Sequence, residues 1–425
     1  MFRLSAKKWN RVPTVPHDRI VRTYREIFAV PEFRILFLAR CTTMAAVAME
    51  GLALATLVYD LTGSTVLTAL SLFGGPLITL VGSATILGAN DAMGPRRATL
   101  LMPLAYAISC AVQVIPDLPV AARFLLLAFP YLVGSATSGS TMRLLHLIVP
   151  PDGFLLGRAT LNIAVGVMQV VGYALGGLLL RLFSPSTLFA IAAVLALLTA
   201  VVVRFGITER PGHQSATGLV ARTRAVNRTL LGSRTTLPLY LAMWVPNGLI
   251  VGCEALYVPY ASRGGSGFLF AAAAAGMLLG DVLIGRVIPP PRRDGMIEPL
   301  RLLLAVPYLG MVFAPSLPVA VALAFVASVG YAASLPLQER LVEHTDDEVR
   351  GQVFGLYGSG LMVGQAVGAA IGGAVAEVLS PAHTMGVLAA VSVAISLALT
   401  VPLRASAPAA TSSPSPPDRS SRAPR

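Results

Sequence analysis

The chain has 425 residues, of which 55% are hydrophobic and only 12% are charged, and its mean hydropathy is +0.74. Ordinary soluble domains are about one quarter charged, so this composition excludes a soluble globular protein and indicates a membrane protein. The formal net charge of +12 comes from 32 Lys and Arg residues that are scattered over separate short segments. A nucleic-acid-binding surface needs a concentrated basic patch, so we expect no nucleic-acid partner.

Residues 1–32 form a polar and basic arm. The arm has no short apolar core followed by a cleavage site, so we expect no cleavable signal peptide. Twelve apolar segments follow, each long enough to cross about 30 Å of hydrocarbon, which takes about 20 helical residues. Residues 302–338 count as two segments because Pro315 and Pro318 interrupt them. The expected transmembrane helices span 35–59, 61–90, 98–116, 124–142, 159–180, 182–203, 235–253, 264–288, the two parts of 302–338, 351–376 and 378–403.

The longest polar stretch between these segments, residues 206–236, divides them six and six. We therefore expect an all-α membrane protein of two six-helix bundles, at 33–205 and 237–404, joined by a linker loop. The tail, 405–425, is rich in Pro, Ser and Ala and is predicted to be disordered.

The distribution of basic residues predicts the orientation. If both termini are cytoplasmic, 28 of the 32 Lys and Arg residues fall on the cytoplasmic side. This bias matches the positive-inside rule. We expect both termini in the cytoplasm, with attraction to anionic lipid as a secondary effect.

The chain contains an internal repeat. The phrase "QVVGYALGG" at 169–177 returns as "QAVGAAIGG" at 365–373, identical at six of nine positions across an offset of 196 residues. The same offset relates Ser184-Pro185 to Ser380-Pro381 and Arg96-Arg97 to Arg292-Arg293. Chance similarity among Ala, Gly and Leu-rich helices is the alternative. Parallel six-helix repeats are typical of secondary transporters that bind substrate between their halves.

Glycines recur every four residues in both copies of the phrase, so they form ridges where helix backbones approach closely. We interpret these ridges as helix-packing surfaces, either static or moving during transport. They consist of Gly172 and Gly176 on the fifth helix and Gly360, Gly364, Gly368 and Gly372 on the eleventh.

Two carboxylates fall well inside apolar segments. Glu50 lies in the first helix and Glu254 in nearly the matching place of the seventh, and intramembrane acids are functional candidates by default. We expect both to face a central cavity and to carry the coupling proton, with a structural polar contact as the alternative for each. Arg40 is a further candidate, but ten residues is about 15 Å of helix, too far for direct pairing with Glu50.

Other polar and aromatic residues complete the predicted site. Gln169 and Gln365 occupy symmetric positions and favour a polar cavity, and Asp281 is predicted to pair with Arg286 and lock a gate. Aromatic candidates for stacking on a flat ligand, or for core and belt positions, are Trp244, Tyr257 and Tyr260.

The sequence shows no phosphate-binding loop, no metal-ligand cluster and no Ser/His/Asp constellation. We therefore expect no enzyme activity, no cofactor and no metal, and transport energy that comes from a gradient.

The segment "LGANDAMGPRR" after the second helix, together with the six-plus-six organisation, resembles the major facilitator superfamily over residues 30–404. Asp91, Gly94, Arg96 and Arg97 fit that family's loop motif, although its first glycine is displaced to Gly88. The resemblance implies that Asp91 and the arginines latch this loop against the eleventh helix. Simple cytoplasmic anchoring charges are the alternative.

Three further phrases look like the branch of siderophore exporters and macrolide-efflux proteins: "LVYDLTGST", "VPPDGFLLGRATL" and "EALYVPYASRGGSGFLFAAAAAGMLLG". Two family positions differ. Tyr173 replaces the proline of the antiporter phrase, and Leu127 replaces a glycine four residues after Arg123, which stands where proton-coupled members use an arginine.

The resemblance implies a monomeric transporter in a bacterial plasma membrane. We expect proton-coupled efflux of a lipophilic or amphiphilic small molecule by alternating access, with the substrate, protons and the bilayer as partners. The alternatives are a nutrient or sugar importer on the same fold and a non-transporting sensor or scaffold.

Overall fold

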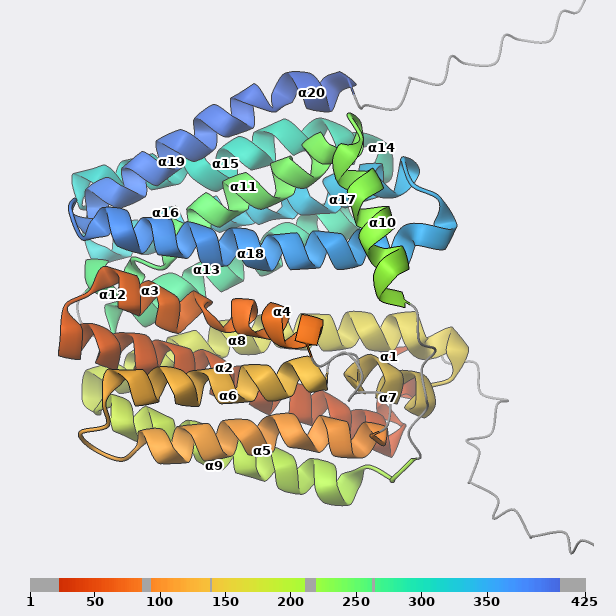
Figure 1. Cartoon of the computed structure of the whole chain (residues 1–425), viewed down its shortest axis with the longest axis vertical. Helices are drawn as coiled ribbons and strands as arrows, with labels where there is room; N and C mark the ends of the chain where they lie inside the picture. Colours follow the sequence, from red (N-terminus) through yellow and green to blue (C-terminus); the bar gives the residue numbers. More distant parts are fainter. Residues whose placement is uncertain (1–22, 86–92, 138–139, 211–218, 262–263, 406–425) are drawn as a thin grey trace, which may run out of the picture.

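The computed structural model describes residues 23–85, 93–137, 140–210, 219–261 and 264–405. All regular elements in these ranges are helices (Figure 1), which confirms the all-α prediction. Nine described helices are long and apolar enough to cross a membrane, or eleven if two bent pairs count as one span each. Helix α5 (Pro95–Gln113) packs against α6 and α9 and supplies a twelfth membrane-length element.

The N-terminal half occupies the lower part of Figure 1, and its described residues form nine α-helices. A glycine with a positive φ of 64°, Gly63, ends α2 and turns the chain into α3. Besides α5, these helices are α1 (Tyr24–Phe28), α2 (Pro31–Thr62), α3 (Thr65–Phe73), α4 (Gly75–Thr85), α6 (Val120–Ala136), α7 (Ser140–Ile148), α8 (Phe154–Leu182, preceded by a 3₁₀ turn at Pro151–Gly153) and α9 (Pro185–Gly206).

The C-terminal half begins at α11, after the linker helix α10 (Leu219–Gly232) that lies in the predicted 206–236 loop. Its helices are α11 (Thr236–Glu254), α12 (Tyr257–Tyr260), α13 (Gly265–Val282), α14 (Pro290–Arg293), α15 (Ile297–Leu309), α16 (Leu317–Val329), α17 (Ser334–Glu343), α18 (Arg350–Ala376), α19 (Pro381–Ala398) and α20 (Thr400–Ala405). Shorter turns are a π-helix at Leu283–Val287 and 3₁₀ turns at Asp294–Met296, Gly310–Phe313, Gly330–Ala333 and Asp347–Val349.

We call the end of the molecule with α1, α10 and α14 the linker end, on the right in Figure 1, and the opposite end the far end. Large apolar side chains are exposed on the outer surface of both halves, including Leu125, Phe205 and Phe313. Single exposed apolar residues are common on soluble proteins, but extended exposed apolar surface is typical of a membrane or protein contact. The pattern therefore supports a membrane environment for both halves.

The two predicted glycine ridges pack inside their own halves. A Cβ at Gly172 or Gly176 would meet Ala45, Ala48 and Met49 of α2. On α18, Gly360 and Gly364 lie against Trp244 of α11, and Gly368 and Gly372 lie against the backbones of Gly248 and Gly252 of the same helix. The ridges thus join α2 to α8 and α11 to α18, in the same pseudo-symmetric way, and do not lie between the halves.

The next glycine of each repeated phrase makes the contact between the halves. Gly177 of α8 lies against Gly264 and Gly267 at the start of α13, and Gly373 of α18 lies against Thr65 and Val66 of α3. Both contacts are at the far end (Figure 1). The hydroxyl of Thr65 also donates to the carbonyl of Gly373 over 2.7 Å. The far end is therefore where the halves close against each other.

Candidate functional site

A cavity of about 300 Å³ lies between the halves. The C-terminal half supplies most of its wall, and the N-terminal half contributes Phe73 of α3 and Gln169 and Tyr173 of α8. The cavity extends from Glu254 toward residues nearer the linker end, including Leu337 and Tyr357. The glycine contacts of Gly177 and Gly373 close the far end of the interface between the halves.

Four lining residues lie where a helix is interrupted. Glu254 is the last residue of α11, Tyr331 lies in the 3₁₀ turn before α17, and Asp281 precedes the π-helix by two residues. Phe73 ends α3 at a bend of 51° before α4. Irregular backbone at membrane depth is tolerated where it is buried in protein or lines a cavity, and π-bulges are frequent at functional sites. The interruptions therefore mark this cavity as the candidate site.

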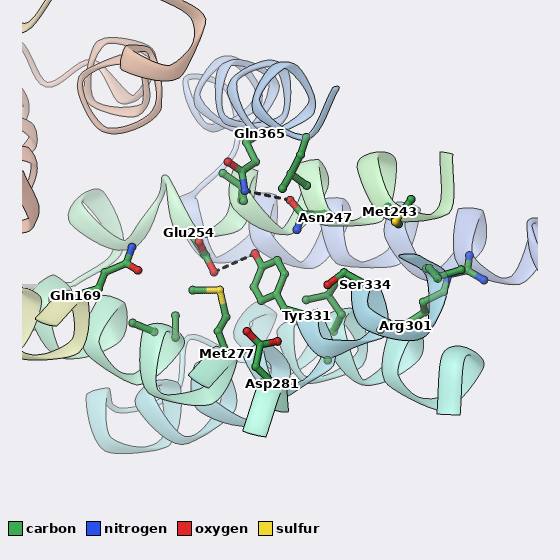
Figure 2. Close-up of a pocket in the computed structure, with 18 of the residues that line it drawn as sticks. Gln169, Met243, Asn247, Glu254, Met277, Asp281, Arg301, Tyr331, Ser334 and Gln365 are labelled. Carbon is green, nitrogen blue, oxygen red and sulfur yellow. Dashed lines mark hydrogen bonds between the residues drawn. The ribbon is translucent and has the colours of Figure 1, made fainter. Parts of the chain in front are cut away.

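Glu254 is the central charged group of the cavity. Its side chain is only 6% exposed, and the hydroxyl of Tyr331 donates to its Oε1 over 3.1 Å (Figure 2). Close by, Nε2 of Gln365 donates to Oδ1 of Asn247 over 3.4 Å. An ionised carboxylate at this burial with one neutral donor is poorly compensated, so a proton or a cationic ligand would stabilise it.

Asp281 points into the same space as Glu254 and Tyr331 in Figure 2. The predicted pairing of Asp281 with Arg286 is wrong, because Arg286 lies beyond the start of the π-helix and its Nη2 donates to the Tyr24 hydroxyl over 3.0 Å. Asp281 is therefore a cavity residue, and Arg286 contacts the N-terminal arm.

The structure does not place Glu50 on the central cavity, which corrects the prediction for this residue. Glu50 is 1% exposed, and Nε2 of Gln113 on α5 donates to its Oε1 over 3.4 Å. The tyrosines Tyr106 and Tyr131, whose rings are 6.3 Å apart, lie within electrostatic range of the same carboxylate. The sequence gives the depth of Glu50 but not the face of α2 on which it lies, and that face packs inside the N-terminal half.

Arg123 and Arg40 also lie inside the N-terminal half. Arg123 is 4% exposed, and its Nη1 donates to the carbonyl of Gln113 over 3.2 Å, which caps the end of α5. Arg40 lines a separate cavity of about 220 Å³ among α2, α5, α6, α7 and α9. Neither arginine forms an ion pair with Glu50 among the described residues, so the three candidates are not one direct charge cluster.

The aromatic candidates lie beside the cavity without lining it. Trp244 donates to the carbonyl of Tyr357 over 3.0 Å, Tyr257 shares a hydrogen bond with Tyr308, and Tyr260 donates to the carbonyl of Pro315 over 3.0 Å. Gln169 and Gln365, in contrast, do line it. The sequence reading missed Asn247, Phe270, Met277 and Tyr331; the glycine before Tyr331 and the proline before Asn247 were the available signals of local helix irregularity.

Tyr173, which replaces the proline of the antiporter phrase, has a specific place in the cavity. Its ring stacks on Phe270 of α13 with the centroids 4.9 Å apart. The residue that departs from the family pattern is therefore an aromatic contact between the two halves.

The predicted loop latch has other partners in this structure. Asp91 lies outside the described residues. Arg96 and Arg97 both pair with Glu209, and a Cβ at Gly94 would meet the carbonyl of Arg210. These contacts connect the start of α5 to the segment after α9.

A carboxylate connects the two halves at the far end. Glu377, just after α18, accepts hydrogen bonds from the Ser64 hydroxyl over 2.8 Å and from the Val66 amide over 3.2 Å. These donors, the Ser64 hydroxyl first, hold the pKa of Glu377 below its ordinary value of 4.5. Arg181 of α8 also lies over the ring of Phe268 of α13, 4.7 Å from its centroid. We call the contact of Glu377 with Ser64 and Val66 the far-end latch.

Comparison with known proteins agrees with this architecture. The sequence profile of the Major Facilitator Superfamily matches residues 239–424, and no curated protein sequence matches the chain. Two crystal structures of a POT family transporter, with a thioalcohol conjugated peptide and with 5-aminolevulinic acid, are similar at 12% identity and a TM-score of 0.67. They cover 87% and 88% of this chain, and 95% and 96% of those chains. The chain has the major facilitator fold.

A mutant peptide transporter POT in complex with alafosfalin is similar over 91% of this chain and 99% of its own, at 13% identity and a TM-score of 0.66. The similarity covers both halves of the major facilitator fold, while the sequence match lies in the C-terminal half. That half also supplies most of the cavity wall.

Proposed function

We propose that the protein is a secondary transporter that works by alternating access and couples proton entry to efflux of a lipophilic or amphiphilic small molecule. The observation that carries the proposal is the cavity between the halves, with Glu254 buried on its wall and the far end closed. A substrate site at the interface of two six-helix halves is typical of this fold.

Glu254 is the proposed coupling residue. A protonated carboxylate is far easier to occlude than an ionised one, so proton occupancy biases the step that closes the cavity. Glu50 has the same depth in its own half but no contact with the cavity, and we assign it a structural polar role. This assignment retains one of the two coupling candidates that the sequence indicates.

The chemistry of the cavity supports an amphiphile. Its wall combines Phe73, Tyr173, Phe270 and Met277 with the amides of Gln169 and Gln365, and small-molecule sites are mostly apolar with a few placed polar groups. The resemblance of several phrases to the siderophore-exporter and macrolide-efflux branch supports export.

Peptide uptake is the second candidate function, because one structurally similar transporter is in complex with a thioalcohol conjugated peptide and another is a peptide transporter. A peptide carries a carboxylate as well as an ammonium group. Arg301 is the only basic residue among the lining residues that the structure describes; it is 2% exposed and donates from Nη2 to the Ser396 carbonyl over 2.8 Å. The missing free base favours the efflux proposal over peptide uptake.

We further propose that the protein lies in the plasma membrane with the linker end in the cytoplasm. Five arginines at that end form ion pairs among the described residues: Arg96, Arg210, Arg293, Arg340 and Arg404. The positive-inside rule expects such basic residues on the cytoplasmic side. The structure then corresponds to an inward-open conformation. Reporter fusions after Arg234 should read as cytoplasmic, and labelling of such a fusion from outside intact cells would contradict the orientation.

The transport proposal is tested with purified protein in proteoliposomes. An imposed pH gradient should drive flux of a lipophilic probe, and a protonophore should abolish it. Flux that is unchanged by the protonophore would contradict proton coupling. Accumulation of a dipeptide driven by the same gradient, without flux of the lipophilic probe, would favour the uptake function.

A further inference from the structure

The charged groups of the cavity are distributed unevenly. Glu254 and Asp281 point into the same space, whereas Figure 2 shows the guanidinium of Arg301 directed away from both carboxylates. Arg301 reaches α19, where it contacts the Ser396 carbonyl. Among the lining residues that the structure describes, there is no other base. The ligand space therefore faces two acids without a basic partner.

The neighbours of Glu254 do not neutralise its charge. The Tyr331 hydroxyl is its hydrogen-bond donor, and Cys253 and Tyr257 are the titratable groups next to it along the chain. On the other packed elements, Tyr173, Tyr308 and Tyr331 lie within electrostatic range of Glu254. Asp281, Arg301 and Tyr357 line the same cavity, and the guanidinium of Arg301 is directed away from Glu254. A buried charge without an opposite charge is strongly destabilising. The site is therefore most stable when a proton or another cation occupies it.

Aromatic rings complete the site. Phe73, Tyr173, Phe270 and Tyr331 come from four different elements and line the same cavity as the two carboxylates. Aromatic faces attract organic cations when water is excluded. Rings together with unpaired carboxylates fit an apolar cation better than a neutral or anionic molecule.

We propose that the substrate is a lipophilic organic cation that binds between Glu254, Asp281 and these rings, and that the cation and the proton compete for Glu254. This inference rests on the proposed transport function for its physiological role, but the binding site itself can be measured separately. Competition at one carboxylate couples the two flows, because the proton that enters displaces the cation that leaves. No second coupling site is needed in the N-terminal half.

The test uses two probes of the same shape and opposite charge. Purified full-length protein in detergent is titrated with tritiated tetraphenylphosphonium, and tetraphenylborate serves as the matched anion. We expect saturable binding of the cation, no competition by the anion, and weaker binding of the cation as the pH falls, because protons compete. Failure of the folded wild-type protein to bind the cation, equal binding of the anion, or cation binding that is independent of pH would overturn the inference.

Variants locate the site. Glu254→Gln should weaken cation binding by about tenfold or more, since it removes a buried charge partner. Asp281→Asn removes a more exposed carboxylate of the same cavity and should weaken binding by about three- to tenfold. Glu298→Gln is the matched control: it removes a carboxylate of the same half that pairs with Arg404 outside the cavity, and it should leave affinity within about twofold. Size-exclusion profiles and melting temperatures check folding. If one cavity variant does not fold, the other and the pH titration of the wild type still decide the outcome.

Flux measurements separate this inference from the transport proposal. Cation binding that depends on Glu254, without gradient-driven flux of the cation in proteoliposomes, would support the site and contradict the transport function. Gradient-driven flux of a neutral amphiphile, with no preference for the cation, would overturn the cation site and leave the transport function standing.

Discussion

The first membrane-length helix of each half buries a carboxylate, Glu50 in α2 and Glu254 in α11, yet the two residues have different surroundings. Glu50 is enclosed within the N-terminal half and receives a hydrogen bond from Gln113. Glu254 lies at the end of α11, beside the cavity, and receives one from Tyr331. The continuous helix around Glu50 buries its acid, while the interrupted helix exposes Glu254 to a ligand space.

This difference shows that the internal repeat preserves architecture and not chemistry. Both ridges of glycines pack the fifth membrane span of a half against its first span. These spans are α8 and α2 in the N-terminal half, and α18 and α11 in the C-terminal half. The polar groups around the carboxylates are not repeated in the same way. We therefore expect equivalent substitutions in the two halves to affect different properties.

The largest expected effect comes from neutralising the two carboxylates. Glu254→Gln should lower gradient-driven flux by about two orders of magnitude, a usual loss when a proton-transfer group is removed. Glu50→Gln should retain most of the flux, because its carboxylate does not reach the cavity. Initial rates in proteoliposomes with equal protein insertion measure both. Similar losses in both variants would show that the halves act as equivalent proton sites.

The second comparison sets glycines within a half against glycines between halves. A side chain at Gly368 would overlap the Gly248 carbonyl inside the C-terminal half, so Gly368→Val should reduce stability by about 1 to 3 kcal/mol, as overpacking does. At Gly373 the added atom meets Val66 of the other half. Gly373→Val should therefore leave the melting temperature nearly unchanged and separate the halves at the far end.

Melting curves and cysteine labelling distinguish these outcomes. A single cysteine at Val66, in a background without the three native cysteines, should react faster with a membrane-impermeant maleimide in Gly373→Val than in the parent. Unchanged labelling together with a lower melting temperature would mean that Gly373 contributes only to static packing.

The sequence was sufficient to predict the helical fold, because long apolar segments and proline breaks determine which residues span the membrane. It also indicated Glu254, Gln169 and Gln365, since polar side chains at apolar depth are conspicuous. It did not reveal which face of α2 carries Glu50, because this depends on how α5 packs. The pairing of Asp281 with Arg286 was mispredicted because Asp281 lines the cavity while Arg286 donates to the Tyr24 hydroxyl of another helix.

Asn247 and Tyr331 show another limit of the sequence. Neither residue belongs to a motif, and each lines the cavity because its helix is irregular or because a neighbouring helix brings a partner close. Helix interruptions of this kind are tertiary features, since protein contacts must satisfy the freed backbone groups. Such residues become visible only when the helices are assembled.

A third comparison removes the hydrogen-bond donor of each carboxylate. Tyr331→Phe should weaken substrate binding or turnover by about tenfold, because hydrogen bonds to charged groups contribute about 1.5 to 3 kcal/mol. Gln113→Leu should instead lower stability by about 1 to 3 kcal/mol, since it leaves a buried acceptor without its donor, while flux per folded molecule stays near normal. Separate measurements of KM, kcat and melting temperature decide the comparison. Loss of turnover in Gln113→Leu at normal stability would assign Glu50 to the transport cycle.

The smallest expected effect concerns the far-end latch, an exposed contact between the halves. Glu377→Gln keeps an acceptor for Ser64 and Val66 but removes the charge. Maleimide labelling of a cysteine at the far end, placed away from this contact, should therefore change by less than about fivefold, as for exposed charged contacts. The pKa of Glu377 is lowered by these donors, so the latch stabilises the closed end at pH values above the ordinary carboxyl range and loses this effect as the pH falls through the lowered pKa. Maleimides react with the thiolate, so the labelling rate is divided at each pH by that of a free thiol. This relative rate should be constant between about pH 5 and 8 and increase only under strongly acidic conditions in the wild type, with no such increase in Glu377→Gln. An increase between pH 6 and 7 that persists in Glu377→Gln would locate the pH response at another group, with the cavity carboxylate Glu254 as the first to examine.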